Sequence, residues 1–277
     1  GVYTRRDKPV GRKQVLTAPP VKEVALEHGT PVFQPRTLRD GSEDANIRAL
    51  APDLIVVVAY GCILPKSVLE APKYGCINLH VSLLPKYRGS APVQWAVLNG
   101  DTETGVSIMY MAEELDAGDV ILTAKTPIDP EEDLPSLWDR LAKVGAEALA
   151  EALPLLAAGT APRTPQDSTQ ATFAPMLSRE LSPIDWTKPV AAIRNQVRGL
   201  IPWPCATAEL TGQRFKIYKT AVGTATDKTP GTLLSAGKKG IEVACGDGQS
   251  LWITELQAEG GKRMSAAAYL LGHPMHI

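Results

Sequence analysis

Few features of this 277-residue chain point to a cross-linked, secreted or membrane-embedded protein. Its four cysteines are far apart, with no CxxC pair and no spacing typical of zinc ligands: Cys62, Cys76, Cys205 and Cys245. Such thiols indicate free cysteines in a reducing cytoplasm. No apolar run approaches the roughly 18 residues of a membrane span, and the start, GVYTRRDKPVGRK, has no apolar signal core. We therefore expect a cytoplasmic protein without a membrane segment.

Several common catalytic and nucleotide-binding motifs are missing as well. The sequence contains no GxGxxG, no GxxxxGK[ST] and no GxSxG. Dinucleotide-binding, nucleoside-triphosphate-binding and serine-hydrolase functions are therefore disfavoured. Nothing in the residue spacing predicts a metal site, and no internal repeats are evident.

Charge is unevenly distributed, although the formal net charge is only −1. Residues 1–178 hold 17 Lys and Arg against 22 Asp and Glu, whereas residues 179–277 hold 12 against 8. The resulting charges of −5 and +4 favour a polyanion as a partner of the second part, although chance scatter of solvated charges explains them equally well. A further basic cluster surrounds Asp7 near the N-terminus: Arg5, Arg6, Lys8, Arg12 and Lys13.

Strand and helix patterns alternate through the first 160 residues. Four strands are expected, at Asp53–Tyr60, Cys76–Val81, Val106–Met111 and Val120–Thr126. Three helices are expected, at Lys66–Leu69, at Pro92–Gly100, and from Leu134, capped by Asp133, to Gly159. The near-continuous β-branched run at Asp53–Tyr60 predicts a strand buried on both faces of a parallel sheet. Residues 1–160 are thus predicted to form an α/β, Rossmann-like catalytic domain with a mostly parallel sheet.

The second part of the chain has a different pattern. Residues 161–178 are rich in Pro, Thr, Ser and Gln and are expected to be a linker. Residues 179–277 begin with a helix at Val190–Val197, followed only by hairpin patterns. Five short strands in about 75 residues predict a small barrel of the oligonucleotide-binding (OB) type.

The first residues look like the end of a strand entering a loop. By the size of a βαβ unit, a first strand and helix would take about 30 residues. We therefore expect the first strand and helix of the catalytic domain to lie outside this sequence.

Two polar residues interrupt the apolar strand Cys76–Val81. Asn78 and His80 are two positions apart, so their side chains project from the same face of the strand. They lie near the C-terminal end of an expected parallel strand, where open α/β sheets bind their ligands. A histidine at a strand end is, by itself, more often a satisfied polar group than a catalyst.

A carboxylate follows the next expected strand. Asp116 lies in the loop EELDAGD, although Glu113 and Glu114 flank it, and spacing alone does not choose between the three. An amide, an imidazole and a carboxylate on one rim suit acyl transfer without a covalent enzyme intermediate. Asn78 and His80 can donate hydrogen bonds to an oxyanion, and a carboxylate can orient His80 and move protons.

The segment NLHVSLLPKYRGSAPVQWAVLNGDTETGVSIMYMAEELDAGDVI resembles the signature block of the 10-formyltetrahydrofolate-dependent formyltransferases. VYTRRDKPVGR, VVVAYGCILPKSVL, IDW, IPWP and GGKRMSA follow the order and spacing of the family members that act on methionyl initiator tRNA. The resemblance covers essentially the whole chain. It implies an enzyme, active as a monomer, that moves a formyl group from 10-formyltetrahydrofolate to the α-amino group of methionyl initiator tRNA for translation initiation.

Three alternatives share parts of these motifs. They are a formyltransferase that acts on a nucleotide-linked amino sugar, a folate hydrolase domain, and a catalytically idle RNA-binding module. The GGKRMSA segment and the basic second part of the chain argue against the first two. An idle module would not need Asn78, His80 and Asp116 to be intact.

The resemblance also implies site residues. The catalytic set is Asn78, His80 and Asp116, which favours Asp116 over its two flanking glutamates. The folate is contacted by Ser82, Leu83, Leu84 and Pro85, and the pterin pocket is lined by the segment Ala59–Pro65, in particular Ala59, Tyr60, Gly61 and Ile63. The tRNA acceptor end is reached by Arg12 and Lys13. Further phosphate contacts are expected from cations of the C-terminal domain: Lys216, Lys219, Lys238, Lys239, Lys262 and Arg263.

Overall fold

A computed structural model describes residues 1–11 and 13–275 of the chain. These residues form two compact units. The first comprises residues 1–80, 107–123 and 147–169, and the second comprises residues 81–106, 124–146 and 170–277. Two strands and one α-helix contribute to both units: β8 (Glu103–Tyr110), β9 (Val120–Pro127) and α5 (Leu134–Ala157).

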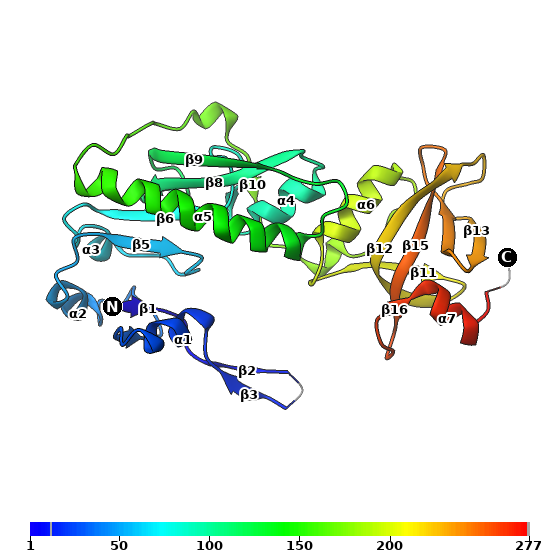
Figure 1. The fold of residues 1–277 in the computed structure, drawn as a ribbon, viewed down its shortest axis with the longest axis horizontal. Coiled ribbons are helices and arrows are strands. Elements are labelled where there is room, and N and C mark those ends of the chain that lie inside the picture. The colour runs from blue at the N-terminus through cyan, green and yellow to red at the C-terminus, as the bar shows by residue number, and fades with distance from the viewer. Residues whose placement is uncertain (12, 276–277) are drawn as a thin grey trace. The chain divides into compact units, whose positions relative to one another are not determined.

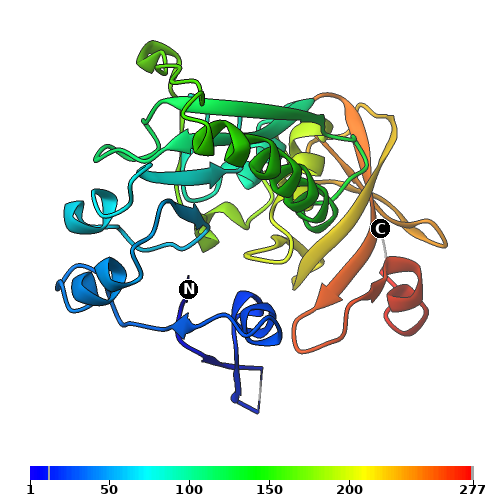
Figure 2. The same cartoon turned by 60° about the vertical axis from the view of Figure 1, so that its left-hand side comes forward.

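The first 50 residues form short elements for which the sequence pattern made few predictions. They are β1 (Val2–Tyr3), β2 (Lys8–Val10), β3 (Val15–Thr17), α1 (Pro20–Glu27), β4 (Val32–Phe33) and α2 (Asp44–Ala49). β1 pairs with β4 in parallel, and the ring of Tyr3 stacks on that of Phe33 at 4.8 Å. β2 and β3 form an antiparallel hairpin that extends away from this pair (Figures 1 and 2).

A four-stranded sheet carries the residues singled out above. Its order is β5 (Ile55–Val58), β6 (Cys76–His80), β8 and β9 (Figure 1). β5 runs parallel to β6, but β8 runs antiparallel to it. The prediction of a mostly parallel sheet is therefore wrong at β8. Residues 81–102 connect β6 to β8, and a connection of this length permits either direction, so the sequence did not reveal the direction of β8.

Strand β5 was expected to be buried on both faces, and this is also wrong. Its exposure alternates, with Ile55 and Val57 packed on a core that includes Leu64 and Val68, while Val58 is 52% exposed. This pattern is that of a strand covered on one face.

The helices predicted in the first 160 residues are confirmed. They are α3 (Lys66–Leu69), α4 (Pro92–Leu98) and α5, which contains Pro154. The carboxylate of Asp133 accepts a hydrogen bond from the backbone N–H of Ser136 at 3.1 Å, which caps α5 as expected.

Parts of the expected linker are paired with strands. Val120 and Thr164 exchange two backbone hydrogen bonds of 2.9 and 3.0 Å. Further along, β10 (Phe173–Ala174) pairs in parallel with β7 (Arg88–Gly89), after a short 3-10 helix at Ser168–Gln170. The domain boundaries at residues 160 and 179 stay predictions.

The C-terminal part forms an antiparallel sheet in which the five predicted strands are present. Its order is β11 (Ala206–Leu210), β12 (Gln213–Ala225), β15 (Gln249–Ala258), β14 (Gly240–Ala244) and β13 (Leu233–Gly237). A 3-10 helix (Arg179–Leu181) and α6 (Val190–Gly199) precede this sheet. The short β16 (Met264–Ser265), paired with β15, and α7 (Ala266–Gly272) follow it. In the described residues no pairing joins β11 to β13, so a closed barrel is not confirmed.

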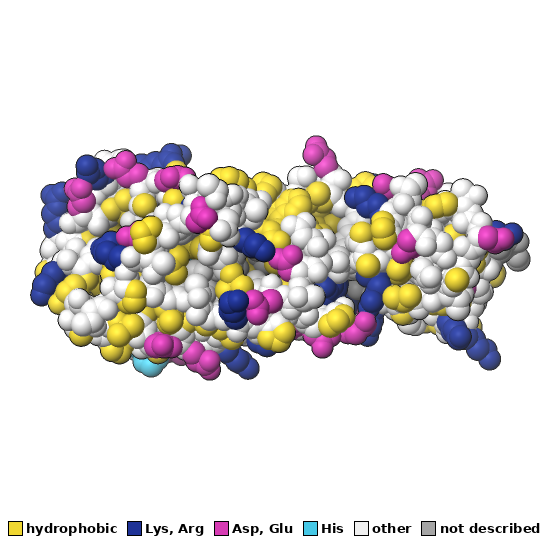
Figure 3. Space-filling view, turned by 90° about the horizontal axis from the view of Figure 1, so that it is seen from above, with side chains coloured by type: hydrophobic (Ala, Val, Ile, Leu, Met, Phe, Trp, Pro, Cys, Tyr) yellow, Lys and Arg dark blue, Asp and Glu magenta, His cyan; other side chains and the backbone are white. Residues whose placement is uncertain are grey.

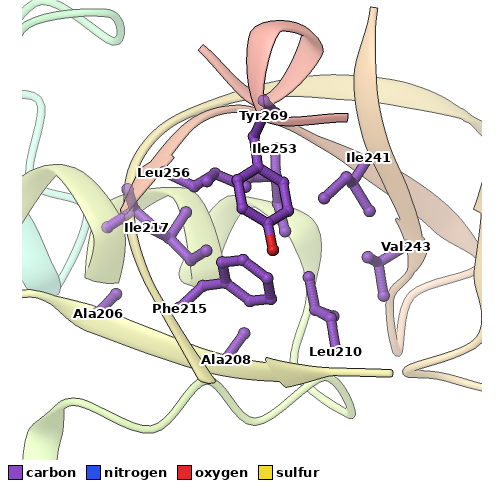
Figure 4. Packing of buried hydrophobic residues seen from close by; sticks show 12 residues of the cluster. Ala206, Ala208, Leu210, Phe215, Ile217, Ile241, Val243, Ile253, Leu256 and Tyr269 are labelled. Atoms are coloured by element: carbon purple, nitrogen blue, oxygen red, sulfur yellow. The ribbon is translucent and has the colours of Figure 1, made fainter. Parts of the chain in front are cut away.

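The core of this part lies between the sheet, α6 and α7. Phe215 of β12 is 1% exposed and meets the ring of Tyr269 of α7 edge-to-face, with ring centroids 5.3 Å apart (Figure 4). Apolar side chains from four strands surround this pair, among them Leu210, Ile217 and Ile253. This continuous apolar cluster gives the C-terminal part its own hydrophobic core.

Candidate active site

Strand β6 holds Asn78 and His80 in fixed positions. Asn78 pairs with Val57 on one side and Met109 on the other, and His80 pairs with Ser107. Both side chains project from the same face, since two residues separate them on a strand. His80 is only 5% exposed, so its ring is held in a largely dehydrated environment.

Asp116 reaches His80 by a route that the sequence did not reveal. Because β8 is antiparallel, it ends at Tyr110 beside Ile77, about 10 Å along β6 from His80. The loop of residues 111–118 therefore folds back toward His80. The predicted neighbourhood of Asp116 and His80 is correct, but the reason given for it, a shared C-terminal rim, is wrong.

His80 and Asp116 form a close, buried pair. The Nδ1 atom of His80 lies 3.7 Å from the Oδ2 atom of Asp116, and the two side chains are 6% and 10% exposed. This separation between the two atoms is longer than a direct hydrogen bond. The carboxylate is thus placed on the Nδ1 side of the imidazole, in surroundings that strengthen electrostatic interactions.

The loop that carries Asp116 has a constrained backbone. Asp116 has a φ of 51°, in the left-handed region that few non-glycine residues adopt. Tyr110 donates a backbone hydrogen bond to Asp119 at 2.9 Å, which closes the loop. A Cβ atom at Gly118 would collide with the carbonyl oxygen of Tyr110, so only glycine fits there.

Sequence reasoning missed Gln166. Its side-chain Nε2 donates to the carbonyl oxygens of Asp116 and Gly118, both at 2.8 Å. It was overlooked because it lies in a polar segment whose composition is that of a linker. No motif separates a glutamine that holds a loop from one that is solvated.

The segment predicted to line a pterin pocket is an irregular loop after β5. Ala59 and Gly61 have φ values of 46° and 68°, and the side chain of Ile63 is 64% exposed. The guanidinium of Arg5 packs against Gly61 and donates to the carbonyl oxygen of Tyr60 at 3.0 Å. Burial raises the pKa of the Tyr60 phenol, which keeps it neutral. The loop thus carries one half-buried aromatic side chain, Tyr60, and one exposed aliphatic side chain, Ile63.

The segment Ser82–Pro85 belongs to the second unit. Ser82 is buried, and its hydroxyl donates to the carbonyl oxygen of Lys86 at 2.6 Å. The Leu84–Pro85 peptide bond is cis. Leu83 contributes to the lining of a cavity of about 390 Å³ that also borders Tyr87 and Asp101. Ser82 thus stabilises its own turn with its hydroxyl.

The cations predicted to bind tRNA occupy several elements. Arg12 lies outside the described residues, and Lys13 is exposed in the turn of the β2–β3 hairpin. The lysines of the C-terminal part are exposed on β12, on the β13–β14 turn and in the loop before β16: Lys216, Lys219, Lys238, Lys239 and Lys262. On the face shown in Figure 3, basic side chains are interspersed with acidic ones.

Arg263 differs from these lysines. Its guanidinium forms two hydrogen bonds, of 2.5 and 3.1 Å, with the carboxylate of Glu255 and lies 4.3 Å from the centre of the Tyr218 ring. The hydrogen bond to Glu255 raises the pKa of Arg263. Much of its charge is therefore neutralised within the chain.

The described part of the chain contains no group of three or more His, Cys, Asp or Glu side chains that could hold a metal ion. Within the same residues, no helix has the length and apolar character of a membrane span.

Comparison with solved structures shows the fold. HypX from Aquifex aeolicus, crystallised with tetrahydrofolic acid, superposes with a TM-score of 0.64 at 22% identity. The match covers 88% of this chain and 43% of the HypX chain. The sugar 3N-formyl transferase WlaRD, crystallised in the presence of dTDP and 5-N-formyl-THF, gives a TM-score of 0.66 at 17% identity. This match covers 90% of this chain and 84% of WlaRD.

Sequence comparison shows the family. Residues 1–153 match the formyl transferase model, and residues 176–274 match the model of the formyl transferase C-terminal domain. The methionyl-tRNA formyltransferase of Trichlorobacter lovleyi is 52% identical over 276 residues, which cover 100% of this chain and 87% of that protein. The chain belongs to the formyl transferase family.

Proposed function

We propose that this chain transfers the formyl group of 10-formyltetrahydrofolate to the α-amino group of methionyl initiator tRNA. The observation that carries the proposal is the buried pair of His80 and Asp116 beside Asn78, in a chain 52% identical over its whole length to a methionyl-tRNA formyltransferase. Formyl transfer from a folate to an amine needs oxyanion donors and a proton acceptor, and these three side chains supply both.

Asn78 and His80 are assigned as the oxyanion donors. Attack of the neutral amine on the formyl carbon forms one C–N bond and places negative charge on the formyl oxygen. The Asn78 amide and the His80 ring project from one strand face, and Asp116 lies on the Nδ1 side of the ring, so Nε2 is the nitrogen assigned to the oxyanion. Donors fixed by a strand do not need to reorganise as the charge develops.

Asp116 is assigned to move the proton. The attacking amine becomes positively charged and must lose a proton before the bond to the folate N10 breaks. A carboxylate beside His80 accepts this proton and stabilises the imidazole as it donates to the oxyanion. The same proton then goes to N10 as the leaving group departs, so no covalent enzyme intermediate forms.

The folate co-substrate is assigned to the loop after β5, in the first unit; contact with Ser82–Pro85, in the second unit, stays a separate prediction from the family resemblance. The half-buried ring of Tyr60 and the exposed side chain of Ile63 offer apolar contact for a planar pterin. Ala59 and Gly61 are exposed and have left-handed backbone conformations, and their peptide groups are assigned to the ring's polar edge.

Three finer assignments accompany this function. The first 160 residues are proposed to be a Rossmann-like domain, supported by the parallel β5–β6 pair and by α3, which connects the two strands. Residues 179–277 are proposed to be an OB-like domain that binds tRNA, supported by the five antiparallel strands and the +4 charge. The enzyme is proposed to act as a monomer in the cytoplasm.

A direct assay tests the proposal. The chain is incubated with 10-formyltetrahydrofolate and charged initiator tRNA, and formylmethionine is measured after mild hydrolysis of the ester. The expected product is formylmethionyl-tRNA, formed at a rate proportional to enzyme concentration. Absence of product, with the protein folded, would contradict the assignment.

An amino-sugar nucleotide is the second candidate acceptor. The fold similarity to the sugar 3N-formyl transferase WlaRD favours it, although only the fold is shared at 17% identity. The same assay with a dTDP-linked amino sugar in place of the tRNA decides between the two. We expect formylation of the tRNA alone.

A further inference from the structure

We infer that Gln166 is a positioning residue for Asp116: its side-chain amide fixes the loop that holds the Asp116 carboxylate beside His80. The inference rests on the proposed function, because it assigns a role in formyl transfer to a residue that does not touch the reacting atoms. No motif in the sequence points to Gln166, and only the folded chain brings it to the loop.

The contacts of the Gln166 amide are directed at the backbone of the catalytic loop. One nitrogen, Nε2, donates to the carbonyl oxygen of Asp116 itself and to that of Gly118, at 2.8 Å each. The bridge spans the residue with the left-handed backbone, Asp116, and the glycine that packs against Tyr110. Gln166 therefore holds the backbone of Asp116 itself, the residue whose carboxylate lies beside His80.

Residues 163–164, just before Gln166, contact the two ends of the loop that carries Asp116, at Tyr110 and at Asp119–Val120. The guanidinium of Arg163 lies 3.6 Å from the centre of the Tyr110 ring, at the end of β8. It also lies 3.7 Å from the carboxylate of Asp119, next to the start of β9. Thr164 exchanges two backbone hydrogen bonds with Val120. These contacts fix the two ends of the loop, and the Gln166 amide contacts its middle, at Asp116 and Gly118.

This division of roles predicts what loss of the amide does. The segment stays bound through Arg163 and Thr164, so the chain still folds. The carbonyl groups of Asp116 and Gly118 then form hydrogen bonds with water instead. The Asp116 carboxylate is no longer held at one distance from His80. A misplacement of about 1 Å can reduce an enzyme's rate by about 100-fold.

The first test compares steady-state kinetics of Gln166→Ala and Gln166→Glu with the wild-type chain. Both variants lose the donor, and Gln166→Glu keeps the side-chain volume, so it decides the test if Gln166→Ala does not fold. We expect kcat to fall about 10- to 100-fold, with KM for tRNA and folate within about twofold. The matched control is Ser168→Ala, an exposed residue of the same segment, which should keep the wild-type kcat.

A double-mutant cycle separates positioning from general stabilisation. If Gln166 acts through Asp116, adding Gln166→Ala to Asp116→Asn should lower the single-turnover rate by less than about twofold, since the group it positions is already disabled. An equal loss in both backgrounds would overturn the inference, as would wild-type kcat in both Gln166 variants. An inactive wild-type chain would instead contradict the proposed function.

A readout that does not depend on activity completes the test. Hydrogen exchange of the amides in residues 111–118 should be about tenfold faster or more in Gln166→Ala, and unchanged in Ser168→Ala. Unchanged exchange in Gln166→Ala would show that other contacts hold the loop, and would reject the role assigned to Gln166 whether or not the chain proves active.

Discussion

The carboxylate of Asp116 lies 3.7 Å from the Nδ1 atom of His80, although the strand that leads to Asp116 runs antiparallel to the strand that carries His80. The pair therefore depends on a loop that turns back along β6, and not on two strand ends that meet. This dependence determines which substitutions should remove activity without unfolding the chain.

Substitution of Asp116 should abolish most formyl transfer. Asp116→Asn keeps the shape of the side chain but removes the proton acceptor, so we expect a decrease in kcat of at least about 100-fold, measured by single-turnover formylation. Glu113→Gln is the matched control, because Glu113 is an exposed carboxylate of the same loop. Equal losses in both variants would show that loop charge, and not Asp116, is responsible.

Substitution of Asn78 should affect the transition state. Asn78→Ala removes one oxyanion donor from a strand position between Val57 and Met109, where the backbone pairing is retained. The loss of one such donor costs about 2.7–4 kcal/mol, or about 100- to 1000-fold in kcat. Circular dichroism should show a wild-type fold. A variant with nearly full activity would exclude Asn78 from catalysis.

The thiols should differ in reactivity according to burial. Burial raises the pKa of the Cys76 thiol to about 12 and that of Cys245 to about 11, and Cys205 is also buried, whereas Cys62 is exposed. Iodoacetamide at pH 8 should therefore label one thiol in the native chain and four in urea, as counted by mass spectrometry. Labelling of more than one thiol without denaturant would contradict the described burial.

The buried thiols of Cys76 and Cys245 make the stability of the chain depend on pH. Their pKa values are raised on folding from an ordinary value of 9.0, so above pH 9 the unfolded chain loses protons that the folded chain retains. The free energy of unfolding should therefore fall as the pH rises from about 9 toward 11 to 12, as measured by urea denaturation. A Cys76→Ala, Cys245→Ala variant should show a weaker decrease over this range.

The C-terminal core should be sensitive to truncation at Phe215. Phe215→Ala removes a ring that packs edge-to-face on Tyr269 and leaves a cavity among residues of four strands (Figure 4). We expect a loss of about 3–5 kcal/mol in the free energy of unfolding, measured by urea denaturation. Val222→Ala, on the same strand but 49% exposed, should change it by about 0.5 kcal/mol or less.

Binding of tRNA should depend on salt through the exposed lysines. Each lysine is expected to contact one phosphate. The double variant Lys238→Ala, Lys239→Ala should therefore reduce by about 2 the magnitude of the negative slope of the logarithm of the tRNA association constant against the logarithm of the salt concentration. Lys66→Ala provides the control, because Lys66 lies in an ion pair with Glu70 on α3 in the first unit. An unchanged slope in the double variant would remove this turn from the tRNA-binding surface.

The sequence was sufficient for features that depend on local spacing. Alternation along β6 placed Asn78 and His80 on one face, and the apolar periodicity of α5 and the capping residue Asp133 located that helix. Strand direction was not encoded locally: the pattern of β8 is the same whether it runs parallel or antiparallel to β6. The path by which residues 111–118 bring Asp116 to His80 could therefore not be predicted from the sequence.

Long-range polar contacts were also inaccessible from the sequence. Gln166 meets a loop 50 residues earlier in the chain, and Arg5 meets Tyr60, 55 residues later. Neither pairing leaves a periodic trace, because each joins a single side chain to backbone carbonyl groups. Exposure of β5 on one face could not be predicted either, since its β-branched composition suits both buried and half-buried strands.

The anchoring of residues 163–166 to the loop has a consequence for how the catalytic part can be excised. The match to the formyl transferase model ends at residue 153, which precedes the hydrogen bonds from Gln166 to the loop. A fragment cut at that residue would keep Asn78, His80 and Asp116 but would lose the Gln166 side chain that holds the loop of Asp116. We therefore expect a minimised catalytic fragment to need the chain at least through Gln166.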